Sequence, residues 1–76
     1  MTRTFIIKTV NEMIKEALNY EDFMDMFMEL ENACDKTNYC VFFDLNIENA
    51  DILCIYNVKS DKTLRIDLTA KLENLD

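Results

Sequence analysis

The hydrophobic pattern of this chain changes once, between residues 35 and 39, and that change limits the fold more than any other feature. Before it, apolar residues recur every three or four positions, which is the spacing of one face of an α-helix. After it, apolar and polar residues alternate in short blocks separated by Asn, Asp and Ser, which is typical of strands and turns. With 76 residues, the chain is expected to form one domain in which helices precede strands.

Two helices are predicted in the first half of the chain. Residues 9–12 have the sequence of a capping box, so we expect the first helix to begin there and to continue over residues 10–18. Asn19, with Asp22 three positions later, indicates the start of a second helix over residues 20–34.

Two segments allow a second interpretation. In residues 24–30, Met and Leu alternate with other residues, which also suits a strand. Because Met, Glu and Leu favour a helix and the segment contains no β-branched residue, we predict a helix there. Residues 4–7 could form either a short edge strand or the first turn of the first helix, and we favour the strand.

Three strands are predicted in the second half: residues 39–45, 52–58 and 64–70. Polar links join them, so an antiparallel meander is expected. We expect Phe43 to pair with Cys54 in the first hairpin and Tyr56 to pair with Ile66 in the second. The helices should cover the face that this register makes continuous, which carries Tyr39, Val41, Phe43, Leu45, Ile52, Cys54, Tyr56, Val58, Leu64, Ile66 and Leu68.

The opposite face of the predicted sheet is apolar over its first two strands. An antiparallel sheet with one face in water should carry polar residues there, as the third strand does with Arg65, Asp67 and Thr69. The first two strands do not, so we expect the N-terminal segment or another chain to cover them. The candidate oligomer interface consists of Cys40, Phe42, Leu53 and Ile55.

Acidic residues are concentrated in the middle of the chain. The formal net charge is −7, and residues 16–58 hold ten acids against a single lysine. Six of these acids lie within residues 19–35, where there is no Lys or Arg. Glu21, Asp25 and Glu29 recur every four residues, so like charges stack on one side of the predicted helix and cost about 0.2–0.5 kcal/mol per pair.

This acidic segment has two interpretations. It could be the solvated face of an acidic protein, or it could present carboxylates to a basic partner that normally binds phosphate groups. The candidate partner-binding residues are Glu21, Asp22, Asp25, Glu29, Glu31, Asp35, Asp44, Glu48 and Asp51.

Other classes of function are disfavoured by the composition. The chain has no histidine to act as a base near neutral pH and no glycine to form a phosphate-binding loop, so we expect no enzymatic activity. Asp44, Asn46 and Glu48 imitate the first ligands of an EF-hand loop, but Asn49 and Ile55 stand where Gly and Glu are required. The three cysteines lack CxxC spacing, and the basic residues are scattered. We therefore expect no metal, no other cofactor and no direct contact with nucleic acid.

The composition also suggests an origin and a location. Glycine and proline are absent while Ile, Asn and Lys are frequent, which indicates an AT-rich coding sequence of a low-GC bacterium, a phage or a mobile element. No segment resembles a signal peptide or a membrane span. We expect a protein in the cytoplasm of a bacterial host cell, without membrane contact.

Together these features predict an α+β domain with two consecutive helices on one face of a three-stranded antiparallel meander. The leading hypothesis is a small acidic inhibitor or adaptor that binds a basic nucleic-acid-handling protein by charge mimicry. In size, acidity and composition the chain is similar to phage-encoded inhibitors of bacterial defence systems, including anti-CRISPR proteins. That likeness is one of kind and implies no particular residues. The alternative is a homo-oligomeric structural or regulatory module, such as a dimer, that assembles through the apolar outer face of the sheet.

Overall fold

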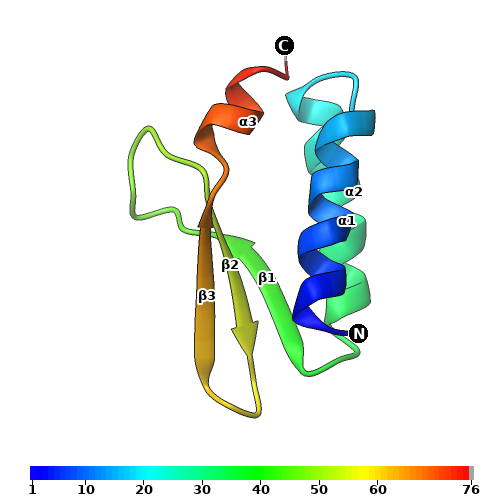
Figure 1. Ribbon diagram of the computed structural model, residues 1–76, viewed down its shortest axis with the longest axis vertical. Coiled ribbons are helices and arrows are strands. Elements are labelled where there is room, and N and C mark those ends of the chain that lie inside the picture. The colour runs from blue at the N-terminus through cyan, green and yellow to red at the C-terminus, as the bar shows by residue number, and fades with distance from the viewer. Residues whose placement is uncertain (76) are drawn as a thin grey trace.

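The computed structural model describes residues 1–75, which form an α+β fold with two long helices on one side of a three-stranded antiparallel sheet (Figure 1). The strands follow the sheet order β1-β2-β3, so the predicted meander is confirmed. The elements are α1 (Arg3–Glu16), α2 (Tyr20–Cys34), β1 (Tyr39–Phe43), β2 (Ile52–Asn57), β3 (Lys62–Asp67) and the short α3 (Thr69–Glu73).

Helix α1 begins seven residues earlier than the predicted first helix, so the predicted N-terminal strand is wrong. Its N-cap is Thr2, whose hydroxyl oxygen accepts a hydrogen bond from the Phe5 amide at 3.1 Å. Thr9 lies inside the helix, where its hydroxyl donates to the Phe5 carbonyl at 2.8 Å. The helix extends to the N-terminal side because Ile6, which is fully buried, continues the apolar stripe of Val10 and Met13.

Helix α2 has the predicted bounds, and a local cap explains why. The Asp22 amide donates to the Asn19 side-chain oxygen at 2.8 Å, and the Asp22 carboxylate accepts from the Leu18 amide at 2.9 Å. The first bond satisfies an amide that the start of a helix leaves without a partner, and the second fixes the chain just before the cap.

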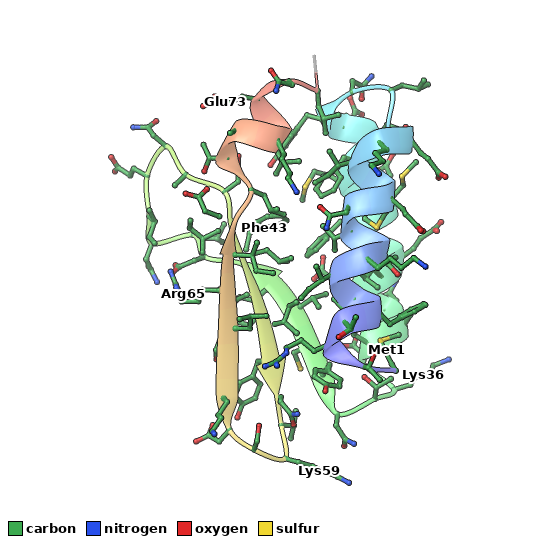
Figure 2. All side chains as sticks on the ribbon, in the orientation of Figure 1. Met1, Lys36, Phe43, Lys59, Arg65 and Glu73 are labelled. Carbon is green, nitrogen blue, oxygen red and sulfur yellow. The ribbon has the colours of Figure 1, made fainter. Side chains whose placement is uncertain are left out.

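Aromatic packing joins α2 to the sheet. The ring of Phe43 on β1 lies 4.8 Å from that of Phe27 and 6.3 Å from that of Phe23, measured between centroids. Both phenylalanines of α2 are buried, and Phe43 points from the sheet toward the helices (Figure 2). The core of the domain therefore lies between the helical layer and one face of the sheet.

The strand register differs from the predicted one, and the difference exchanges the two faces of β2. Val41 pairs with Ile55, and Ile55 pairs with Leu64. The first hairpin is thus shifted by one residue relative to the prediction, which turns Leu53 and Ile55 toward the helices.

The loop between β2 and β3 provides the physical reason for this register. The strands end at Asn57 and resume at Lys62, so the loop has four residues and Ile55 pairs with Leu64, which replaces the predicted pairing of Tyr56 with Ile66. Asp61 adopts a left-handed conformation with φ of 55°, and its amide donates to the Asn57 carbonyl at 2.9 Å. Asp61 thereby takes the position in the turn that glycine often occupies.

The third strand is shorter than predicted, because the chain leaves the sheet after Asp67. The Asp67 carboxylate accepts a hydrogen bond from the Thr69 amide at 2.9 Å, and α3 follows. Leu68, Leu72 and Leu75 are buried and close one end of the core. The predicted continuation of a strand to residue 70 is therefore wrong.

Candidate functional site

The outward side of α2 carries an acidic row. Its buried residues Phe23 and Phe27 lie on the side that faces the sheet, so Glu21, Asp25 and Glu29 lie on the other side and are exposed. Consecutive members of the row are about 6 Å apart along the helix axis. Within residues 1–75, none of the three carboxylates makes an ion pair.

Two further acids of α2 lie near its C-terminus, where they oppose the helix dipole. Glu31 is half-buried in the last turn, and Asp35 is the exposed C-cap residue. The last turn of α2 contains no basic residue, whereas a positive charge there would stabilise the helix. Asp22 differs from both because its carboxylate caps the N-terminus.

Helix α1 contributes one acid that the sequence patterns did not identify. Glu16 lines a shallow hollow of about 370 Å³ between the two helices, together with Glu29 of the acidic row. Met13, Met26 and Leu30 also line it, so the hollow joins apolar surface to two carboxylates. No signal in the sequence locates Glu16 here, since its position depends on how α1 and α2 pack.

The remaining predicted acids follow β1, in a loop that projects from the sheet away from the two long helices (Figure 1). Glu48 is exposed there. Asp44 forms an ion pair with Arg65 at 2.7 Å and accepts a hydrogen bond from the Asn46 amide at 2.9 Å. The Arg65 bond, followed by the Asn46 bond, lowers the pKa of Asp44. The structure therefore does not bring Asp44 and Glu48 into the acidic row.

Asp51 lies at the end of this loop, close to the start of α2. Its amide donates to the Thr69 hydroxyl at 2.8 Å, and its carbonyl accepts from the Leu68 amide at 2.8 Å. Burial of Tyr20, followed by the negative charge of Asp51, raises the pKa of that phenol. Asp51 thus connects the loop to α3 through its backbone.

The predicted oligomer interface is divided between two faces of the sheet, which corrects that prediction. Leu53 and Ile55 are 1% and 2% exposed and belong to the core. Phe42 is 43% exposed and shares the outer face with the half-buried Cys40. Because the register is shifted, the β2 side chains on that outer face are Ile52, Cys54 and Tyr56.

Polar groups border this outer patch. An Arg65 guanidinium nitrogen lies 3.6 Å from the Cys54 sulfur, and Arg65 points away from the helices (Figure 2). The Tyr56 hydroxyl donates to the Asp61 carboxylate at 2.6 Å, and this bond is the main reason that the pKa of Tyr56 is raised. The outer face therefore presents an apolar centre at Phe42 with polar residues at its margin.

All three cysteines are free thiols. Cys34 is buried at the end of α2, where its sulfur lies 3.5 Å from that of Met1. Burial, followed by the nearby Cys40 and Asp35, raises the pKa of the Cys34 thiol, which disfavours the reactive thiolate.

Comparisons with known protein families, with curated proteins and with solved structures found no match to this chain. Within residues 1–75, no helix combines the length and apolar character needed to cross a membrane. The same residues contain no cluster of three or more His, Cys, Asp or Glu side chains suited to hold a metal ion.

Proposed function

We propose that this protein is a small acidic inhibitor or adaptor that binds a basic nucleic-acid-handling protein through the outward face of α2. The observation that carries the proposal is the exposed row of Glu21, Asp25 and Glu29, which has no cationic partner within residues 1–75. A lysine at the middle position would turn two repulsive pairs into attractive ones. A row that lowers the stability of its own helix is expected where a binding partner supplies the positive charge.

The surroundings of the row support an interface with another protein. Met28 is 58% exposed beside the carboxylates, and the hollow at Glu29 offers further apolar contact. Exposed methionine adapts its shape to different surfaces. A basic protein that normally binds a phosphate backbone would find negative charge and contact area on one face of this helix. The composition fits an origin in a phage or mobile element, whose targets would be proteins of a bacterial host.

The partner can be sought by affinity purification from the lysate of a low-GC bacterium. The tagged protein should retain a basic DNA- or RNA-binding protein at low salt and release it near 0.5 M salt, where the Debye length is only about 4 Å. A defined DNA or RNA duplex should compete for the same partner.

Matched charge-reversal variants test whether the acidic row of α2 binds the partner. The double variant Asp25→Lys/Glu29→Lys should lose the partner while its circular dichroism spectrum stays native. The control Glu48→Lys/Glu73→Lys makes the same change in net charge at exposed acids outside α2, and it should keep the partner. If both variants lose the partner equally, net charge alone explains the binding. If the α2 variant keeps the partner, the acidic row is not the binding surface.

A second candidate function is assembly of identical copies through the outer sheet face, which the exposed Phe42 favours. In that case Phe42→Asp should yield monomers in light scattering after size exclusion, and the α2 reversals should leave the assembly unchanged. Leu45→Asp is the control, because this residue is 93% exposed in the adjoining loop. A wild-type protein that is monomeric at high concentration would refute this candidate.

A further inference from the structure

A pocket of about 190 Å³ lies between the N-terminal turn of α1 and the hairpin that joins β2 to β3. Figure 2 shows the start of the chain at Met1 and the hairpin tip at Lys59 toward the same end of the molecule. The charged side chains that line the pocket are Arg3 and Lys62, and both are cationic. In a chain of net charge −7, a pocket whose only charged residues are basic is a distinct feature.

The strand register builds the floor of this pocket. Tyr39 pairs with Asn57, and Asn57 pairs with Lys62, so the three residues form one row across the sheet on its helix-facing side. The next row toward the core contains Ile55 and Leu64, which also line the pocket. The site therefore has an apolar inner wall and polar groups around it.

Hydrogen bonds around the hairpin leave donors available to a ligand. The Asn57 side-chain oxygen accepts from the amides of Lys59 at 3.0 Å and Ser60 at 3.3 Å, so its NH₂ group remains to donate. The acid of the hairpin, Asp61, accepts from Tyr56 on the opposite face of the sheet. Within residues 1–75, the side chains of Arg3 and Lys62 make no hydrogen bond or ion pair, and no carboxylate lines the pocket.

We infer that this pocket binds a small organic anion, a carboxylate or a phosphate monoester that carries a short apolar or aromatic group. Arg3 and Lys62 would contact the anion, and the hydroxyl group of Ser60 adds a further donor. Ile55 and Leu64 would contact the apolar part. The volume is below the roughly 300 Å³ of sites for drug-sized ligands, so the ligand is of the size of phenyl phosphate or benzoate. This site is independent of the proposed α2 surface.

Titration of the ¹⁵N-labelled protein with phenyl phosphate tests the inference. The amides of residues 3–5, 39 and 55–64 should shift along a saturable curve, with a dissociation constant of about 1 mM or below. Benzoate should shift the same amides. Phenol, which is neutral, and inorganic phosphate, which lacks the apolar part, should each bind at least about tenfold more weakly. Equal binding of phenol would refute the role of the cations, and equal binding of inorganic phosphate would refute the role of the apolar wall.

Variants that each replace one basic side chain with neutral Gln test where the anion binds. Arg3→Gln and Lys62→Gln should each weaken phenyl phosphate binding by about tenfold, because each removes a charge-assisted hydrogen bond. Lys59→Gln is the control, since this residue belongs to the same hairpin and carries the same charge but does not line the pocket. Arg3 and Lys62 are both exposed, and the amide spectrum reports directly whether each variant is folded. Unchanged affinity in both pocket variants, or equal weakening in the control, would overturn the proposal.

Discussion

Asp44 joins the end of β1 to the outer face of β3. Its carboxylate accepts a hydrogen bond from the Arg65 guanidinium and another from the Asn46 amide, which closes the turn after β1. Both bonds are stronger to the ionised carboxylate than to the neutral acid, so the folded state holds the pKa of Asp44 below its ordinary value. The residue therefore serves the fold of the loop, and its charge is already compensated.

A pH dependence of stability follows from this lowered pKa. The contribution of Asp44 is fully present above its unfolded-state pKa of about 3.9 and is lost as the pH falls through the lower, folded-state value. We expect Asp44→Asn to unfold at a urea concentration that varies less with pH over this acidic range than that of the wild type. Some dependence should remain, because hydrogen bonds from Thr69 lower the pKa of Asp67 in the same direction.

The control for this measurement is Glu48→Gln, which changes an exposed carboxylate in the same loop that makes no hydrogen bond within residues 1–75. It should keep the wild-type dependence on pH. If Asp44→Asn and the wild type show the same dependence, the ion pair does not stabilise the fold.

At the scale of elements, the hairpin between β2 and β3 decides which side chains of β2 reach the core. Ile55 is 2% exposed on the helix-facing side, whereas Ile52 is half-buried on the outer side. These two isoleucines of one strand provide a matched test of the register.

We expect Ile55→Val to lower the free energy of unfolding by about 0.5–1.5 kcal/mol, because it removes a buried methylene from close-packed surroundings. Ile52→Val should cost less than half as much, since part of the same group already contacts water. Urea unfolding followed by circular dichroism measures both. If Ile52→Val instead lowers the free energy of unfolding more than Ile55→Val does, Ile52 faces the core and the register of β2 is the one predicted from the sequence.

The N-cap of α2 is a second feature that stabilises a single element. Asn19→Ala removes the side-chain oxygen that accepts from the Asp22 amide, and it should lower the free energy of unfolding by about 1 kcal/mol. Asn32→Ala changes the same residue type at an exposed position within α2, where alanine favours the helix. The control should therefore be neutral or slightly stabilising in the same urea measurement, and equal losses would mean that the cap contributes nothing specific.

At the scale of the whole molecule, the two long helices differ in the charge that they present to solvent. On α1 the exposed Lys8 and Lys15 are balanced by the exposed Glu12 and Glu16, whereas α2 carries the acidic row and no basic residue. The negative charge of the chain is thus concentrated on one part of its helical layer, and mutual repulsion there lowers stability.

We expect Asp25→Lys to raise the free energy of unfolding by about 0.5–1 kcal/mol at low salt, because it replaces two repulsive pairs on α2 with attractive ones. The gain should shrink near 0.5 M salt, where such exposed pairs are screened. Urea unfolding at the two salt concentrations tests this, with Glu48→Lys as the control for net charge. A variant that gains stability yet loses a partner would show that the row serves binding. A loss of stability would show instead that Asp25 has a structural role.

Features set by neighbouring residues could be read from the sequence. The bounds of α2 follow from its cap and its apolar stripe, and the row of Glu21, Asp25 and Glu29 follows from the helical period alone. The class and order of the elements follow for the same reason, because each period of the hydrophobic pattern is a local property.

Features set by distant residues needed the tertiary structure. The start of α1 depends on the burial of Ile6, and the faces of β2 depend on the conformation of Asp61 in a turn without glycine. The cationic pocket joins Arg3 to Lys62, which belong to opposite ends of the chain. Local patterns determine what each segment becomes, whereas packing and register decide which segments meet, since both are energies of contacts between residues far apart in sequence.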